Sequence, residues 1–404
     1  MSDPAAASPV RAGGAAIAAL SIASATMFMI PYSTQAIIPA IGQGLHVGSA
    51  VTGLTITVVV IGIGVGAWVM GPLSDRIGRR AVMFGSCALL VLPTALIAFV
   101  SGIVELLVLR TLQGLLLPGL LTVATAYIYE AFPERRIATV VGVYTSALVL
   151  GGFLGRTIPA MIVGEVGWRD ALAVLAVPVA ISAVLIRVLL PPSTPPPKAR
   201  APHHALRAHL ANTPLLLNAL AAGMTFFAFV GLFSVLAYRL ESSVFGLDST
   251  QVGAFYIVWL VGAFAPIAVR LGGRLGPRRV LPVFPVLAAI GLAIGCLPSL
   301  PLMLVGMMLL AGNLFFMVGI AQLLVPQLAL RDRGSAMSLH LTIYYLVGSL
   351  GPFVVGWAWS HSGWTGSVAI AFAALAVALA LALVLRRSAA AAAPPGAETT
   401  PMLS

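Results

Sequence analysis

The chain has 404 residues, of which 60% are hydrophobic and 8% are charged, and its mean hydropathy is +1.06. This composition excludes an ordinary soluble globular protein. The formal net charge of +11 would suit a nucleic-acid-binding protein if the chain were soluble, but the arginines lie in short segments between apolar runs, where they set membrane orientation. We therefore expect an integral membrane protein that contacts the lipid bilayer and no nucleic acid.

Apolar runs recur along the whole chain, and each is long enough to cross about 30 Å of hydrocarbon as a helix. We place these spans at 15–40, 51–71, 81–101, 103–129, 138–163, 170–190, 214–239, 251–271, 280–300, 302–327, 336–359 and 364–386. The prediction is an all-α integral membrane protein with twelve transmembrane helices in two pseudo-symmetric six-helix bundles. The predicted boundaries are a disordered cytoplasmic N-terminus at 1–14, a first bundle at 15–190, a cytoplasmic Pro-rich linker at 191–213, a second bundle at 214–387 and a disordered tail at 388–404.

Lysine and arginine are distributed unevenly between the two sides of the predicted membrane. Of the 22 such residues, eighteen lie in the terminal segments or in loops that follow even-numbered spans, whereas the odd-numbered loops hold only Arg169 and Arg239. Positive residues concentrate on the cytoplasmic side of membrane proteins. The pattern predicts that both termini lie in the cytoplasm.

The loop between the second and third spans, Gly71-Pro-Leu-Ser-Asp-Arg-Ile-Gly-Arg-Arg80, carries four charges. We expect it on the cytoplasmic face, with Gly71 and Gly78 at the two ends of a tight turn. Its one acid, Asp75, suits an ion pair that is made in one conformation and broken in another. A solvated basic turn that only fixes topology is the alternative. The candidate residues of this conformational-switch loop are Gly71, Asp75, Arg76, Gly78, Arg79 and Arg80.

The two halves of the chain repeat each other. Arg274-Leu-Gly-Pro-Arg-Arg279 resembles Arg76-Ile-Gly-Arg-Arg80, with 198 positions between the central glycines. Two further pairs recur at a separation of 196 positions: Gly155 with Gly351, and Trp168 with Trp364. The second copy has Gly273 in place of Asp75, so only the first loop keeps an acid. A parallel repeat of this kind predicts a substrate site near the midplane between the halves.

No catalytic set is apparent. All eleven acidic residues lie in tails, in loops or at the ends of spans. Cys87 and Cys296 lie in apolar spans without a Cys/His cluster, and the sequence has no G-x-x-x-x-G-K-[ST] nucleotide-binding loop. We therefore expect no enzyme activity, no metal, no cofactor and no direct use of ATP.

In the interior of the spans, away from their ends, the only residues that carry or can acquire a positive charge are Arg110, Arg156 and His340. An arginine deep in the membrane costs about 2.5–3.5 kcal/mol on insertion scales, so each arginine needs a partner or a polar cavity. One interpretation of Arg110 is a structural residue bonded to backbone carbonyls and Gln113. His340 could carry a proton, because the ordinary pKa of histidine lies near neutrality, or could be bonded to a backbone carbonyl.

Arg156 lies in a glycine-rich part of the fifth span. Gly142, Gly151 and Gly155 precede it, and Gly351-Pro352 takes the equivalent place in the eleventh span. Glycines there let helices approach closely, and the guanidinium binds groups with electron pairs or negative charge. If Arg156 faces a cavity, an anionic or zwitterionic substrate is favoured over a hydrophobic cation.

Several other side chains are candidates for lining a cavity, although such residues also commonly pack between helices. The full set of substrate or coupling candidates is Arg156, Arg110, Gln113, Tyr32, Gln35, His340, Tyr344 and Tyr345, with Phe226 and Phe227 as further lining residues.

Three motifs are similar to those of a known family. The switch loop resembles the loop between the second and third transmembrane helices of the major facilitator superfamily, and Leu109-Arg-Thr-Leu-Gln-Gly114 resembles its R-x-x-Q-G element. The second resemblance implies a role for Arg110 in coupling or in local polar packing. The fifth span resembles the antiporter glycine signature, with Arg156 in place of a proline. Together with Tyr32–Pro39, Gly167-Trp-Arg169 and Tyr344-Tyr345, these motifs resemble a bacterial subgroup of inner-membrane efflux-type facilitators.

The resemblance implies a monomeric secondary transporter in the bacterial inner membrane. It would move a small organic solute by alternating access, as gradient-driven, proton-coupled efflux. Two alternatives stay open. One is an importer of an organic anion or other nutrient with the same fold, and the more remote one is a membrane-embedded sensor or enzyme.

Overall fold

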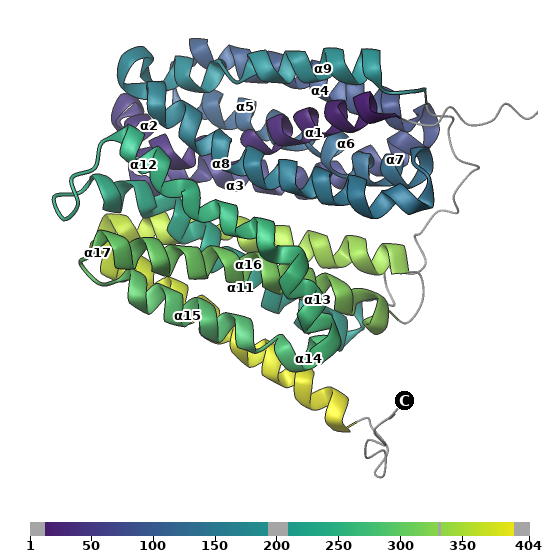
Figure 1. Cartoon of the computed structure of the whole chain (residues 1–404). Coiled ribbons are helices and arrows are strands. Elements are labelled where there is room, and N and C mark those ends of the chain that lie inside the picture. Colours follow the sequence, from purple (N-terminus) through teal and green to yellow (C-terminus); the bar gives the residue numbers. More distant parts are fainter. Residues whose placement is uncertain (1–12, 193–208, 330–332, 392–404) are drawn as a thin grey trace, which may run out of the picture.

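The computed structural model of the chain describes residues 13–192, 209–329 and 333–391, and every regular element in these ranges is a helix (Figure 1). The first half contains α1 (Gly14–Met29), η1 (Gln35–Ile37), α2 (Ile38–Leu45), α3 (Ser49–Ile77), α4 (Arg79–Ala95), η2 (Leu96–Phe99), α5 (Ile103–Leu116), α6 (Pro118–Leu121), α7 (Val123–Ala131), α8 (Glu134–Ala173) and α9 (Ala176–Leu189). The second half contains α11 (Thr213–Glu241), α12 (Ser249–Phe255), η3 (Tyr256–Phe264), α13 (Ala265–Leu275), α14 (Pro277–Val280), α15 (Val283–Gly295), α16 (Leu300–Leu328) and α17 (Arg333–Ala391).

The described residues form twelve membrane crossings, as the hydropathy pattern predicts. Nine helical stretches are long and apolar enough to span a membrane. Two of them turn back at glycines with non-helical backbone, Gly167 (φ 79°) and Gly363 (φ 57°), so each of these stretches contains two crossings. The broken segment from α1 through α2 provides the first crossing.

Several helices begin or end near the predicted domain boundaries, which stay predictions. α1 begins at Gly14 and α11 at Thr213, while 1–12, 193–208 and 392–404 lie outside the described residues. One boundary differs, because α17 continues to Ala391, four residues past the predicted end at 387. Three consecutive alanines at 389–391 favour this extension, since alanine has the highest helix propensity.

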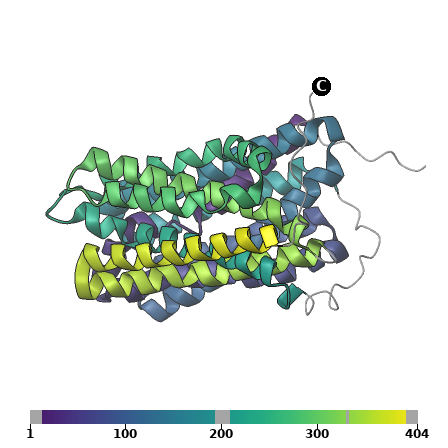
Figure 2. The same ribbon diagram turned by 90° about the horizontal axis from the view of Figure 1, so that it is seen from below.

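The two halves form separate bundles that lie side by side (Figure 1). Figure 2 shows the second bundle from below, with the two crossings of α17 running along it. Each half has its own close glycine contact. A Cβ on Gly155 would lie 2.5 Å from the Met29 Cα, and a Cβ on Gly351 would lie 2.3 Å from the Phe227 carbonyl oxygen. Only glycine permits these backbone contacts of α8 with α1 and of α17 with α11.

The predicted sequence repeat has a counterpart in backbone conformation. Gly78 and Gly276 have φ values of 94° and 93° at equivalent turns of the two halves. Glycine adopts such positive φ values at little cost, whereas other residues are strained there. The same turn therefore recurs in both bundles, as the repeat predicts.

Hydrogen bonds join the bundles at the end where the chain passes from α2 to α3 and from α11 to α12. On α3, the Ser49 hydroxyl donates to the Gly356 carbonyl at 2.7 Å, and the Thr57 hydroxyl donates to the Ser349 carbonyl at 2.6 Å. On α8, the Thr157 hydroxyl donates to the carbonyl of Gly253 at 3.0 Å. We call this the odd-loop end, because it carries the loops that follow odd-numbered spans.

Candidate functional site

The first membrane crossing is broken in its middle. α1 ends at Met29, and the next regular helix, α2, begins at Ile38 after the short η1. Pro31 lies at the break, where its ring disfavours a continuous helix and it has no N–H to donate. The break turns backbone carbonyls away from helical bonding and brings Tyr32 and Gln35 into the protein interior.

Arg110 bonds to this break from α5. It is fully buried, and its guanidinium donates to the carbonyls of Thr55 (3.0 Å), Ile30 (2.9 Å) and Pro31 (2.9 Å). Gln113 accepts a further bond from Arg110 at 2.8 Å and donates to the Thr94 hydroxyl at 2.9 Å. All three guanidinium nitrogens of Arg110 are therefore engaged within the protein.

Arg156 reaches the same break from α8, but with a different set of partners. It is also fully buried. Its Nε donates to Gln35 Oε1 at 2.7 Å, and its Nη1 donates to the Gly152 carbonyl. Aromatic rings surround the guanidinium, whose carbon lies 4.0 Å from the Trp259 ring centre, 4.5 Å from that of Tyr32 and 5.4 Å from that of Tyr256. We call these five residues the Arg156 cluster: Tyr32, Gln35, Arg156, Tyr256 and Trp259.

Three buried N–H donors of the Arg156 cluster have no acceptor among the described residues. They are Arg156 Nη2, Gln35 Nε2 and Trp259 Nε1. The amide orientation of Gln35 follows from its bond to Arg156, because only the amide oxygen accepts from a guanidinium. Buried polar groups in proteins are nearly always bonded, so three free donors in one cluster indicate a place for an acceptor.

The Arg156 cluster joins the two bundles. Tyr32, Gln35 and Arg156 come from the first bundle, while Tyr256 and Trp259 come from η3 in the second. The Tyr256 hydroxyl lies within hydrogen-bond distance of two backbone carbonyls, that of Phe233 in its own bundle at 3.0 Å and that of Gln35 in the first bundle at 3.3 Å. The Trp259 ring centre lies between 4.9 and 6.3 Å from those of four other rings, Phe28, Tyr32, Phe229 and Phe315. The polar centre is thus enclosed by aromatic side chains from both halves.

Sequence reasoning missed Tyr256 and Trp259. Both lie in an otherwise apolar span, where aromatic residues are easily interpreted as core. The available signal was the position of Trp259 deep inside a span, because membrane tryptophans are otherwise enriched at the two interfaces.

Among the described residues, the remaining aromatic candidates are not part of the set of rings that surrounds the Arg156 guanidinium. Tyr344, Tyr345 and Phe226 form their own aromatic group, with the Phe226 and Tyr344 rings stacked at 4.6 Å and the two tyrosine rings 5.0 Å apart. His340 is buried on α17, the helix that carries Tyr344 and Tyr345, and its Nδ1 has no partner among the described residues. The backbone carbonyl of Phe227 packs against Gly351 where α11 contacts α17.

The residues predicted to allow close helix packing differ in their surroundings. A Cβ on Gly151 would lie 2.0 Å from the carbonyl oxygen of Ala25, so this position, like Gly155, packs tightly on α1. Pro352 contributes the carbonyl that approaches Gly53 of α3. Around Gly142, no atom of the described residues lies within 4 Å of the place that a Cβ would take.

Comparison with known proteins identifies the fold. The family model of the Major Facilitator Superfamily matches residues 17–265 and 242–403, which together cover most of the chain. The chain belongs to the major facilitator superfamily. It is therefore a multi-pass membrane transporter of the secondary type and not an enzyme.

Individual members of the superfamily resemble this chain to different extents. The inner membrane transport protein YnfM of Escherichia coli is 29% identical over 356 residues, covering 86% of this chain and 85% of that protein. The multidrug resistance protein MdtM of E. coli is 29% identical over 124 residues, covering 31% of this chain and 30% of that protein. Among solved structures, a D-xylose-proton symporter superposes with a TM-score of 0.73 at 14% identity, covering 92% of this chain and 96% of that one.

The superfamily loop at 71–80 differs from the predicted turn. α3 runs through Gly71 to Ile77, so only Gly78 turns the chain. The helix continues past Pro72, and the Gly71 carbonyl accepts a 2.7 Å bond from the Ser74 hydroxyl. Pro72 has no N–H to bond the carbonyl of Trp68, four residues earlier, so the helix continues with one backbone bond fewer.

The charged side chains of this loop contact the first bundle. Arg79 pairs with Asp75 at 2.5 Å and with Glu130 at 3.1 Å. Arg80 donates to the Arg187 carbonyl, and Arg76 is exposed. These ion pairs of Arg79 and this bond of Arg80 all lie within the first bundle.

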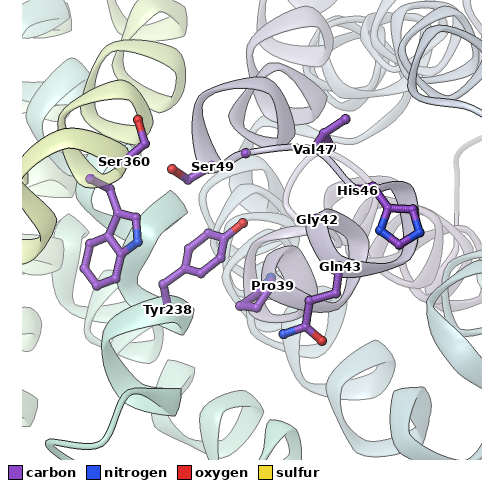
Figure 3. A pocket seen from close by; sticks show the side chains of 10 residues that line it. Pro39, Gly42, Gln43, His46, Val47, Ser49, Tyr238 and Ser360 are labelled. Carbon is purple, nitrogen blue, oxygen red and sulfur yellow. The ribbon is translucent and has the colours of Figure 1, made fainter.

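A cavity of about 450 Å³ lies where the bundles meet at the odd-loop end of this transporter. Pro39, Gln43 and His46 line it from the first bundle, and Tyr238 and Ser360 from the second (Figure 3). The hydroxyl of the lining residue Tyr238 lies 3.1 Å from that of Thr52, which is a hydrogen bond between the bundles.

Proposed function

We propose that this protein exports a small organic solute across the bacterial inner membrane, driven by a proton gradient. Membership of the superfamily supports secondary transport, and the partial similarity to a protein named for multidrug resistance supports export. The observation that carries the proposal is the Arg156 cluster, a buried polar centre with free donors that is shared between the two bundles.

Alternating access follows from the way this site is assembled. Tyr32 and Arg156 move with one bundle and Trp259 with the other, so rocking of the bundles opens and closes the space between them. In the arrangement described here the bundles are joined at the odd-loop end through Ser49 and Thr157. The excess of positive residues in the termini and the even-numbered loops, eighteen against two in the odd-numbered loops, supports a periplasmic location for that end. The described arrangement would therefore be closed toward the periplasm.

The switch loop would act in the opposite arrangement. Asp75 is paired with Arg79 of its own bundle here, and its side chain remains 36% exposed. When the cytoplasmic ends approach, Asp75 becomes available for a contact with the second bundle. This contact would stabilise the arrangement that is closed toward the cytoplasm.

Transport in oriented vesicles tests direction and coupling. Inside-out and right-side-out vesicles containing the protein are compared with vesicles that lack it, using labelled organic acids, amino acids and cationic drugs. We expect gradient-dependent accumulation in inside-out vesicles, abolished by a protonophore. Accumulation in right-side-out vesicles only would show import and overturn export, and accumulation insensitive to the protonophore would overturn proton coupling.

A further inference from the structure

Arg156 is a buried cation without a counter-charge. Its recorded partners, Gln35 and the Gly152 carbonyl, are neutral. No acidic residue of the chain lies in the middle of a span, and both ion pairs recorded in the described residues are made by Arg79. A buried charge is costly unless it is paired. The Arg156 cluster therefore lacks one negative charge.

The free donors indicate which chemical group the cluster lacks. Arg156 Nη2, Gln35 Nε2 and Trp259 Nε1 are all donors, and none has an acceptor among the described residues. A carboxylate only accepts, and its two oxygens offer about four lone-pair positions. One carboxylate supplies both the charge and the acceptors that the cluster lacks, whereas a neutral carbonyl supplies acceptors alone.

The rest of the site limits the ligand further. Arg156 is the only cation in the cluster, so a dianion would leave one negative charge unpaired in a poorly polar interior. An organic cation would face the like charge of Arg156. The rings of Phe28, Phe229 and Phe315 around Trp259 offer an apolar surface to the remainder of the ligand. These features select a monoanion with an apolar or aromatic body.

Room for the ligand is provided by movement of Trp259. Its ring covers the guanidinium of Arg156 at 4.0 Å and belongs to the other bundle. Trp259 lies within η3, a 3₁₀ segment of nine residues, whereas 3₁₀ runs longer than three or four residues are uncommon and often mark a hinge. Separation of the bundles or rearrangement of η3 would lift the ring from Arg156.

We propose that the Arg156 cluster binds the carboxylate of a small organic monoanion with an apolar body, held by Arg156 Nη2, Gln35 Nε2 and Trp259 Nε1. This assignment rests on the proposed function, because it names the substrate class of the same site.

Ligand-dependent thermal unfolding of the purified protein tests the assignment. Benzoate and phenylacetate are compared with benzamide, which is neutral, and benzylamine, which is cationic, at equal ionic strength. A ligand that binds the folded form raises the unfolding temperature with its concentration. We expect this rise with the two carboxylates only. Stabilisation by neither carboxylate, or equal stabilisation by benzamide or benzylamine, would overturn the assignment.

Substitutions of Arg156 test whether benzoate binds at the Arg156 cluster. Arg156→Gln should weaken benzoate binding about 10- to 100-fold, the usual range for losing a charge-assisted hydrogen bond, and Arg156→Lys should weaken it less because the charge stays. Arg136→Gln removes an exposed arginine at the start of α8 and should leave binding unchanged. If benzoate bound Arg156→Gln as tightly as wild type, Arg156 would not be the carboxylate site.

Two milder variants serve if Arg156→Gln does not fold. Trp259→Phe keeps a ring and removes one donor, and Gln35→Leu removes another. Each should weaken benzoate binding, and unchanged binding in both would overturn the assignment. The vesicle experiment separates this proposal from the broader one. If the vesicles exported only cations, the proposed export would be supported and the carboxylate site would be refuted. If carboxylates bound but nothing were transported, the carboxylate site would be supported and the proposed export would be refuted.

Discussion

The Ser49 hydroxyl donates a 2.7 Å hydrogen bond to the carbonyl oxygen of Gly356, and so ties α3 of one bundle to α17 of the other at the odd-loop end. Along the same pair of helices, Gly53 packs against Pro352 and Thr57 bonds to Ser349. This line of close backbone contacts stabilises the described arrangement, and it is the natural place to perturb the balance between two arrangements.

Gly53→Ala should weaken the closed odd-loop end. A Cβ at this position would lie 2.4 Å from the Pro352 carbonyl oxygen. Overpacking of this kind costs about 1–3 kcal/mol, which corresponds to a shift of about 5- to 150-fold in the equilibrium. Spin labels at Val166 and Val244, one exposed position on each bundle near this end, should report a longer distance. Gly64→Ala is the matched control, because its Cβ would meet Tyr345 at an ordinary 3.5 Å; an equal response in both variants would contradict this reasoning.

Asp75→Asn should shift the same equilibrium in the opposite direction. The variant loses only a partly exposed ion pair with Arg79 in the described arrangement, worth about 0–1 kcal/mol. It would lose the proposed contact with the second bundle in the other arrangement. The labels at Val166 and Val244 should therefore report a larger closed population, with little change in unfolding temperature. Glu134→Gln, which removes an exposed acid at the start of α8, should have no effect. A longer distance in Asp75→Asn would refute the role given to the switch loop.

Arg110→Lys should destabilise the protein more than Arg156→Lys does. Lysine cannot reproduce the planar set of donors that bonds the carbonyls of Ile30, Pro31 and Thr55. Each buried carbonyl left unpaired costs about 1–3 kcal/mol. Arg156 makes fewer bonds and already has a free nitrogen, so its replacement by lysine loses less. Thermal unfolding in detergent compares the two, and an equal loss would show that Arg110 does not support the break in the first crossing.

Gly167→Ala should destabilise the protein by about 1–3 kcal/mol, because φ 79° with ψ 165° is a backbone conformation that essentially only glycine adopts. The backbone there has φ 79°, and nothing lies within 4 Å of the new Cβ, so the loss is conformational. Gly164→Ala, one turn earlier, is equally uncrowded but helical, and it should be neutral or stabilising by up to about 1 kcal/mol. The difference between their unfolding temperatures is the measurement. If both variants behaved alike, the backbone at 167 would not have this conformation.

The sequence by itself determined the crossings, the repeat and the expected orientation. These properties depend on local apolar length, on loop charge and on the spacing of glycines such as Gly78 and Gly276, all of which are present in the linear order of residues. It did not reveal that α3 continues past Gly71 or that α17 reaches Ala391, because helix ends depend on which backbone groups find partners.

Only the tertiary structure distinguished Arg110 from Arg156. In the sequence both are single arginines within apolar spans, and the same insertion cost applies to each. The fold surrounds Arg110 with carbonyls from the broken first crossing, about 80 residues earlier, and satisfies it. It places Arg156 beneath Trp259, 103 residues later and in the other bundle, with one nitrogen free. A buried charge is defined by its partners, and partners this distant in the chain are brought together only by packing.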